Sequence, residues 1–184
     1  NLEVRGTVLD HGIPCLAFSI RERWHVNVFE NRLEELALGK GPWLNDLKRL
    51  VSAEAQDETE VAARWRIGDE PVERHFTLGW LKREILNVVP GQKFTYVTDV
   101  AWTERNVERI VDLARGSELL FVEAAFLDRE REHAAAKKHL TARQAGTLAR
   151  LAGVTRAVPF HLSPRHEGEE HLIRAELDAA FRGG

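Results

Sequence analysis

The sequence predicts an α/β fold, in which helices cover a layered β-sheet. Strand-like and helix-like segments alternate through the second half of the chain, and single polar residues follow several of the strands. The chain has 184 residues of which 43% are hydrophobic, enough for one domain with a sizeable core. Alternation of strand and helix is typical of layered α/β proteins, so we expect neither a helical bundle nor a β-sandwich.

The chain should begin with β-structure. Residues 2–10 and 15–22 both have the composition of strands. Between them, His11-Gly12-Ile13-Pro14 contains the glycine and proline that mark a turn. Residues 24–29 form a third candidate strand, because polar and apolar side chains alternate along it.

The segment from about 31 to 90 has a different pattern and is expected to be an inserted helical arm. Leucines at helical spacing lie on both sides of Gly39-Lys40-Gly41-Pro42. Residues 52–60 are acidic and should face solvent. We therefore expect an insertion between two elements of the core.

From residue 93 onward the alternation becomes regular. In order, we expect a strand at 93–98, a helix at 103–114, a strand at 118–123, helical residues at 128–137, a helix from Thr141, a strand at 156–161 and a helix at 167–181. Thr141 and Gln144 have the spacing of a capping box, which supports the start of that helix.

Composition excludes several classes of protein. The net charge of −3 gives no general attraction to nucleic acid, and no run approaches the roughly 18 apolar residues of a membrane span. We therefore expect no membrane partner. Cys15 is the one cysteine, so no internal disulfide can form, which fits a cytoplasmic location.

Polar residues at strand ends are the strongest functional signal. Asp99, Glu123 and His161 each close a predicted strand, and His11 follows the first one. Carboxyl ends of strands in α/β sheets commonly carry functional groups, and imidazoles with carboxylates suit zinc or another borderline divalent metal. Taken singly, Asp99 could also begin a turn, Glu123 could be a buried acid with hydrogen-bond partners, and His161 could be a loop histidine.

Two further places offer candidate residues. His139 precedes a capped helix and could exchange a proton with a substrate if an acid such as Glu123 oriented it; a solvated helix start is the alternative. Ser163 and Arg165 follow His161 and suit a phosphate or carboxylate, although such an arginine is also common as plain surface charge.

Seven short stretches together resemble the ribonuclease Z (tRNase Z) branch of the metallo-β-lactamase superfamily. In order they are Leu9-Asp10-His11-Gly12-Ile13-Pro14, Gly39-Lys40-Gly41-Pro42, Tyr96-Val97-Thr98-Asp99, Phe121-Val122-Glu123-Ala124-Ala125-Phe126, His139-Leu140-Thr141 with Gln144-Ala145, Pro159-Phe160-His161 and Leu162-Ser163-Pro164-Arg165-His166.

The resemblance implies an αββα sandwich with two zinc ions at one edge. It would make His11, Asp99 and His161 metal ligands, His139 the proton donor to the leaving oxygen, and Glu123 the acid that orients His139. The implied chemistry is metal-assisted hydrolysis of a phosphodiester, including tRNA 3′-end processing. The segment at Gly41-Pro42 resembles a loop of the protruding arm that holds tRNA in this family.

The family's His-x-His-x-Asp-His metal motif is absent from the sequence. The resemblance therefore implies the carboxy-terminal portion of a longer protein, whose amino-terminal half would be its partner, and an isolated chain that is inactive. A homodimer and an RNA substrate are the other partners that it implies.

Two alternatives to the phosphodiesterase remain open. One is a metal-dependent hydrolase of a small ester, thioester or cyclic nucleotide, which the mildly acidic charge of residues 31–66 and the absence of a basic stripe favour modestly. The other is a non-catalytic binding module that keeps the fold with a degraded metal site.

Overall fold

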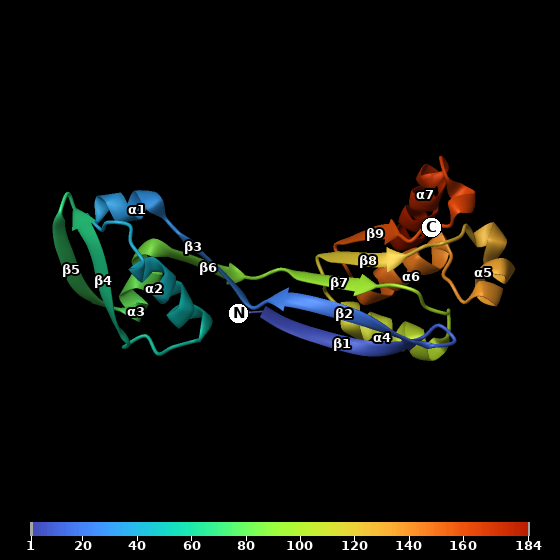
Figure 1. The fold of residues 1–184 in the computed structure, drawn as a ribbon, viewed down its shortest axis with the longest axis horizontal. Coiled ribbons are helices and arrows are strands. Elements are labelled where there is room, and N and C mark those ends of the chain that lie inside the picture. The colour runs from blue at the N-terminus through green and yellow to red at the C-terminus, as the bar shows by residue number, and fades with distance from the viewer. Residues whose placement is uncertain (1, 184) are drawn as a thin grey trace. The chain divides into compact units, whose positions relative to one another are not determined.

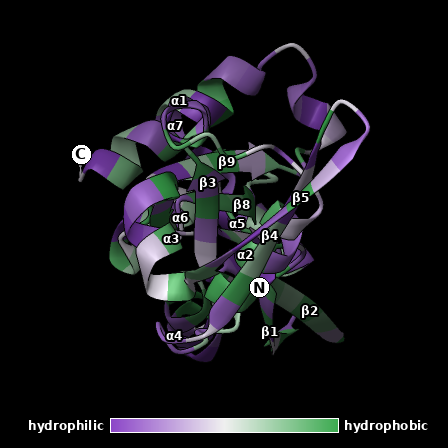
Figure 2. Cartoon of the chain, turned by 90° about the vertical axis from the view of Figure 1, so that its left-hand side faces the viewer, coloured by the Kyte–Doolittle hydropathy of each residue, from purple (hydrophilic) through white to green (hydrophobic). Residues whose placement is uncertain are grey.

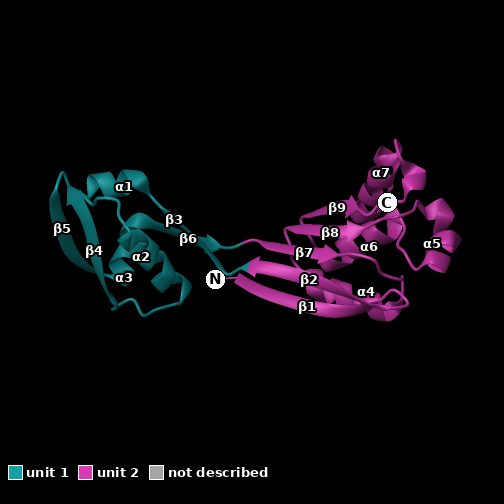
Figure 3. Ribbon diagram, in the orientation of Figure 1, with its two compact units in different colours: residues 1, 22–91 teal, residues 2–21, 92–184 magenta. Residues whose placement is uncertain are grey.

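The computed structural model describes residues 2–183 and divides the chain into two compact units (Figures 1 and 3). Unit 1 comprises Glu22–Gly91. Unit 2 comprises Leu2–Arg21 and the chain from Gln92 onward. Unit 1 is therefore inserted in the sequence between two segments that belong to unit 2.

Unit 2 contains five strands and four α-helices among the described residues. They are β1 (Leu2–Asp10), β2 (Pro14–Glu22), β7 (Lys93–Val97), α4 (Glu104–Ala114), β8 (Leu119–Glu123), α5 (Arg131–Lys137), α6 (Ala142–Ala152), β9 (Arg156–Phe160) and α7 (Glu170–Arg182), with short 3₁₀ helices η1 (Asp128–Glu130) and η2 (Pro164–His166). The elements predicted for this part are confirmed. The last helix begins later than expected because η2 precedes it.

The strands of unit 2 form one sheet in the order β1-β2-β7-β8-β9. β2 and β7 are antiparallel, whereas β7, β8 and β9 run parallel to one another. Helix α4 packs against β1 and β7, and α6 packs against β8 and β9. The predicted α/β class is confirmed, and the helices make the second layer (Figure 1).

The core of unit 2 lies between the sheet and these helices. Leu9, Val97 and Leu120 point inward from the strands and are almost fully buried. Ile110 and Leu148 meet them from α4 and α6. The helices carry both hydrophilic and hydrophobic residues (Figure 2), as expected where one side packs on a sheet. None of the helices within residues 2–183 combines the length and apolar character needed to cross a membrane.

The opposite side of this sheet is apolar and exposed. Side chains alternate between the two faces of a strand, so the neighbours of the buried residues share the outer face. Seven of the large apolar side chains there are 40–62% exposed: Val4, Val8, Leu16, Phe18, Ile20, Phe94 and Tyr96. We call these seven residues the outer apolar face. Contiguous apolar surface of this kind is unusual for a sheet that packs on nothing.

Unit 1 mixes strands and helices. Its elements are β3 (Trp24–Val28), α1 (Glu30–Glu35), α2 (Trp43–Ser52), β4 (Glu60–Ile67), β5 (Glu70–Thr77), α3 (Leu78–Ile85) and β6 (Leu86–Pro90). The predicted strand near 24–29 is confirmed as β3. Strands β4, β5 and β6 lie in the segment predicted to be a helical arm and were not predicted, although Val61, Ala63 and Trp65 alternate on the buried side of β4.

Gly39 allows a close approach inside unit 1. A Cβ atom at this position would lie 2.0 Å from the Trp65 ring, so any larger residue would displace the buried indole. Trp43 also binds here, donating from its indole N–H to the Gly39 carbonyl over 3.0 Å. The glycine therefore has a packing role between the chain before α2 and strand β4.

Two strand pairs share one register. In unit 2, β2 and β7 place Arg21 opposite Lys93. In unit 1, β3 and β6 are also antiparallel and place Trp24 opposite Pro90. Trp24 lies three residues after Arg21 in the sequence, and Pro90 lies three residues before Lys93. The residue numbers of two partners therefore have the same sum in both strand pairs.

Candidate functional site

Three parallel strands bring polar residues to one edge of the sheet in unit 2. The parallel strands β7, β8 and β9 all end there, with Val97 opposite Val122 and Glu123 opposite Phe160. Asp99 follows β7, Glu123 ends β8, and His161 follows β9. This edge holds the residues that the sequence analysis singled out, because parallel strands end on the same side of a sheet.

Asp99 and His161 form a contact at this edge. His161 Nδ1 lies 2.8 Å from Asp99 Oδ1. The Thr98 hydroxyl donates to the same carboxylate oxygen over 3.0 Å. His161 has φ of +54°, in the left-handed region that non-glycine residues seldom adopt and that is found disproportionately at functional sites.

Glu123 and His139 form a second, more buried pair. His139 Nδ1 lies 2.8 Å from Glu123 Oε2, and the Glu123 side chain is 0% exposed. The Val100 N–H donates to Glu123 Oε1 over 2.6 Å. His139 Nδ1 therefore faces the carboxyl group, and Nε2 is the ring nitrogen left for other partners.

Burial dominates the protonation of this pair. It raises the pKa of Glu123 to about 8; the Val100 N–H opposes this shift, and the negative charge of Asp99 adds to it. Burial also lowers the pKa of His139, and the neighbouring His11 imidazole acts in the same direction. A carboxyl group that favours its proton beside an imidazole is a common arrangement for proton exchange.

His11 joins the site from the turn after β1. Its ring centroid lies 4.7 Å from that of His139, whose ring is 5.3 Å from that of His161. His11 Nδ1 is 2.8 Å from the carbonyl oxygen of Lys138. A carbonyl only accepts, so Nδ1 carries the proton and Nε2 keeps a free electron pair, the form of imidazole that binds a metal.

The donor atoms at this edge are close enough for a metal ion. One atom each from Asp99, Glu123, His139 and His161 lie within 4.8 Å of one another. Imidazole nitrogen with carboxylate oxygen is a donor set that suits zinc and similar divalent ions. The residues therefore fit a metal. Of the predicted ligands, Asp99 and His161 are in this group and His11 is beside it.

Ser163 and Arg165 lie just beyond His161. The Ser163 hydroxyl accepts the Arg165 N–H at the start of η2, over 3.4 Å. Arg165 is exposed, with Nη1 3.8 Å from Glu130 Oε1. His166 is buried, with Nε2 2.7 Å from Glu130 Oε2 and Nδ1 3.4 Å from Glu169 Oε2. The burial of His166 between two acids indicates a structural role.

Asn106 is a residue of this region that the sequence analysis missed. It lies on α4, is 2% exposed and makes side-chain hydrogen bonds to Asp10 and Ala101. Its position carried a signal: Asn106 precedes Ile110 by four residues, which puts a polar group on the apolar side of an amphipathic helix. Such a residue must find partners on burial.

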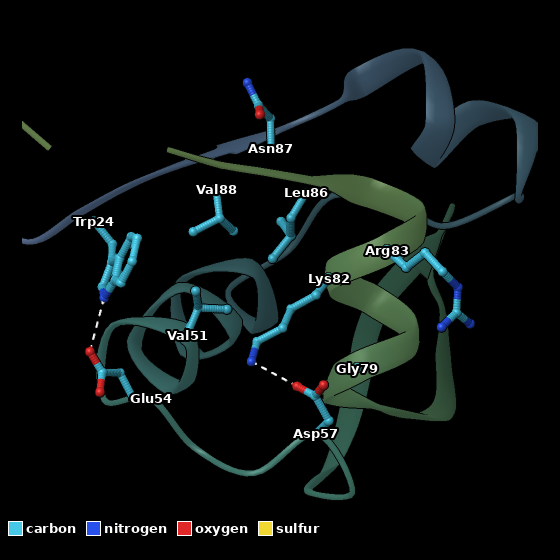
Figure 4. A pocket seen from close by; sticks show the side chains of 10 residues that line it. All are labelled: Trp24, Val51, Glu54, Asp57, Gly79, Lys82, Arg83, Leu86, Asn87 and Val88. Carbon is cyan, nitrogen blue, oxygen red and sulfur yellow. Dashed lines mark hydrogen bonds and ion pairs between the residues drawn. The ribbon is translucent and has the colours of Figure 1, made fainter. Parts of the chain in front are cut away.

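Unit 1 has a hollow of its own (Figure 4), of about 710 Å³. It is lined by Trp24, Val51, Glu54, Asp57, Gly79, Lys82, Arg83, Leu86, Asn87 and Val88. Lys82 donates to Asp57 over 2.8 Å, and the Trp24 indole donates to Glu54 over 3.1 Å. These paired groups make no metal-ligating cluster, so the sheet edge remains the candidate site.

Comparison with known proteins gives consistent matches. A family described as "Beta-lactamase superfamily domain" matches residues 45–162. Ribonuclease Z of Deinococcus radiodurans is 32% identical over 177 residues, covering 95% of this chain and 49% of the relative. Ribonuclease Z of Thermobifida fusca is 35% identical over 176 residues, covering 95% and 48%. The chain spans about half the length of the curated relatives it matches.

A solved structure agrees on the fold. The metallo-β-lactamase fold protein YhfI from Bacillus subtilis aligns with a TM-score of 0.51 at 13% identity. The alignment covers 97% of this chain and 43% of YhfI. At this identity the likeness concerns architecture alone, and it agrees with the αββα-type fold that the resemblance implied.

Proposed function

The chain belongs to the metallo-β-lactamase superfamily and resembles its ribonuclease Z members, and from this we propose that it contributes to metal-dependent hydrolysis of RNA phosphodiesters. The observation that carries this proposal is the meeting of Asp99, Glu123, His139 and His161 at one sheet edge. Histidines and carboxyl groups that gather at strand ends, with shifted pKa values among them, are typical of catalytic and metal-binding sites. Precursor tRNA, cut at its 3′ end, is the proposed substrate, as the resemblance to ribonuclease Z implies.

Zinc is the proposed metal, with two ions in the complete enzyme. His11, Asp99 and His161 would hold metal, since each offers a donor atom of a kind that zinc accepts. When bound, such ions stabilise negative charge on the phosphate and make a water molecule more acidic. The chain's own part is to fix these ligands, through the Lys138 carbonyl for His11 and through the left-handed backbone of His161.

His139 is the proposed proton donor. Its Nδ1 is bound to Glu123, so Nε2 is the atom that can pass a proton to the departing ribose oxygen. Glu123 acts as a positioning residue, because it holds the imidazole ring in one orientation. Ser163 and the exposed guanidinium of Arg165 are proposed to bind the phosphate from the side of η2.

The proposed partner is the other half of the sandwich, corresponding to the part of the relatives that the chain does not span. The outer apolar face supports this, because stacked sheets bury such a face about 10 Å from another sheet. The chain alone is then expected to have weak or no activity. Unit 1 is proposed as the arm that holds RNA. A cytoplasmic location is also proposed, which the single free cysteine fits. A homodimer is a further proposal.

Zinc stoichiometry and cleavage measured on the chain alone test the proposal. We expect weak zinc binding that His161→Ala abolishes, and little turnover of precursor tRNA. Two tightly bound ions with full turnover would contradict the incomplete site. Zinc binding that is unchanged in His161→Ala would contradict the proposed metal site itself.

Substrate comparison separates the alternatives. The assay uses precursor tRNA, a generic phosphodiester and a thioester, each with and without the complementary half of the protein. Cleavage of the thioester alone would point to a small-molecule hydrolase, and no cleavage of any substrate in the complete protein would point to a binding module.

A further inference from the structure

The Asn106 side chain is buried near the proposed site and uses both ends of its amide group in hydrogen bonds. Its Oδ1 accepts the Asp10 N–H over 3.0 Å. Its Nδ2 donates to the carbonyl oxygens of Asp10 and Ala101, each over 2.8 Å. One amide group thus binds both backbone groups of Asp10 and a carbonyl from a different segment.

These partners lie directly beside proposed site residues. Asp10 immediately precedes His11 in the turn after β1, and Ala101 is two residues after Asp99. The two segments also meet through the Ala101 N–H, which donates to the Asp10 carbonyl over 2.9 Å. Asn106 therefore joins the segment that carries His11 to the segment that carries Asp99.

Only an amide satisfies all these groups. The site needs one acceptor and two donors from a single short side chain, which asparagine supplies and which aspartate or leucine does not. Without the amide, the backbone groups of Asp10 and Ala101 would each have one hydrogen-bond partner fewer at this partly buried position. The chemistry of the side chain is therefore set by its partners.

Helix α4 gives the amide a fixed base. The Thr103 hydroxyl accepts the Asn106 N–H over 3.2 Å and caps the helix. One turn later, Ile110 is buried in the core of unit 2. The Asn106 side chain thus extends from a helix whose position is set by packing, not by the loops that it binds.

We propose that Asn106 is a positioning residue that fixes the separation of His11 and Asp99. The inference rests on the proposed function, because it concerns two of the proposed metal ligands. It adds a residue of α4, outside the strand ends, to the machinery of the site. Asn106 touches neither metal nor substrate in this proposal and acts through Asp10 and Ala101.

The first test is metal affinity in the full chain. Zn²⁺ or Co²⁺ is titrated into wild type and into Asn106→Asp and Asn106→Ser, the second being the milder change if the first fails to fold. We expect affinity to fall by at least ~10-fold, as for other groups that orient ligands without binding metal. Unchanged affinity in a folded variant would overturn the inference.

A matched control removes general destabilisation. Thr95 is buried in β7, four residues before Asp99, and its hydroxyl lies 2.8 Å from that of Ser117. Thr95→Val breaks this buried hydrogen bond away from the site and should leave metal affinity unchanged. An equal loss of affinity in this control would assign the Asn106 effect to stability alone.

A double variant identifies the ligand that Asn106 positions. Once His11→Ala has removed one ligand, Asn106→Asp should weaken metal binding by a clearly smaller factor than in wild type. Equal factors in the two backgrounds would contradict the role assigned to Asn106.

A metal-free measurement separates this inference from the proposed function. Nitrogen NMR of His11 reports the Nδ1 proton held by the Lys138 carbonyl. We expect Asn106→Asp to release this proton to fast exchange, while Thr95→Val preserves it. A wild-type protein that binds no metal would contradict the proposed metal site. A His11 signal that Asn106→Asp leaves unchanged would separately contradict the positioning role of Asn106.

Discussion

Three histidines at the sheet edge are held in the same manner. Nδ1 faces the Lys138 carbonyl in His11, the Glu123 carboxyl in His139 and the Asp99 carboxyl in His161. In each ring, Nε2 is the nitrogen that does not face the carbonyl or carboxyl oxygen. Groups that hold one ring nitrogen set the tautomer and the direction of the other. The three side chains are therefore oriented before any ligand arrives.

His161→Ala should remove a metal ligand without unfolding the chain, because the imidazole is 45% exposed. We expect zinc affinity to fall by more than the roughly 10–100-fold that is typical of an outer-shell partner. Isothermal titration calorimetry measures this. His171→Ala is the matched control on exposed surface of α7 and should bind zinc as wild type does.

His139→Ala should reduce turnover of RNA by about 10²–10⁴-fold in the active form of the protein, the usual contribution of a general acid. A substrate with a nitrophenolate leaving group needs no proton, so its cleavage should lose far less. Steady-state kinetics with both substrates measures the difference. Equal losses on the two substrates would argue that His139 binds metal and donates no proton.

At the scale of elements, two residues, Thr141 and Gln144, determine where α6 begins. Thr141 accepts the Gln144 N–H, and the Gln144 side chain accepts the Thr141 N–H in return, which completes the predicted capping box. The Thr141 hydroxyl also donates to Asp128 over 3.1 Å. The cap thus fixes the chain immediately after His139.

Thr141→Ala should destabilise the chain by about 1–2 kcal/mol, because it removes the cap and leaves a backbone N–H without its partner. Urea unfolding followed by circular dichroism measures the change. Thr147→Ala, in the middle of the same helix, is the control and should change the free energy of unfolding by less than ~0.5 kcal/mol. Similar losses in both variants would contradict the importance of the cap.

The elements of unit 2 could be predicted because their signals are local. The cap at Thr141 and the alternation in β2 can be read from neighbouring residues. Strands β4 and β5 were harder, because charged residues such as Arg64 and Glu73 occupy their exposed side and interrupt the apolar pattern. The Gly68-Asp69 pair between them was the overlooked turn signal.

The candidate site was predictable in part for the same reason. Asp99, Glu123 and His161 were found because strand ends in a parallel sheet meet whatever the details of packing. Asn106 was not predicted because its side chain binds backbone groups of Asp10 and Ala101. Every residue has such groups, so the sequence does not show which of them bind a side chain.

At the scale of the whole molecule, unit 1 occupies the place of a hairpin loop. Strands β2 and β7 pair directly in unit 2, up to Arg21 opposite Lys93, although 71 residues lie between these two positions. The sheet of unit 2 therefore needs only a connection between these strand ends. Among residues 2–183, the buried residues that form the core of unit 2 all belong to unit 2 itself.

Replacing residues 23–91 by Asn-Gly should leave unit 2 folded, because this pair forms the two-residue turn that suits an antiparallel hairpin. We expect cooperative thermal unfolding and a dispersed NMR spectrum. Replacing 23–91 by Pro-Pro is the control, since proline has φ fixed near −65° and cannot form this turn, so it should disrupt the hairpin. Loss of folding in both variants would show that unit 2 depends on unit 1.

The register within each of these two strand pairs restricts how this protein can change in length. A residue added inside β2, β3, β6 or β7 would exchange the inner and outer faces of the rest of that strand against its own partner. Length variation among descendants of this sequence should therefore avoid these strands and be confined to connections such as Gly68-Asp69, where no pairing has to be preserved.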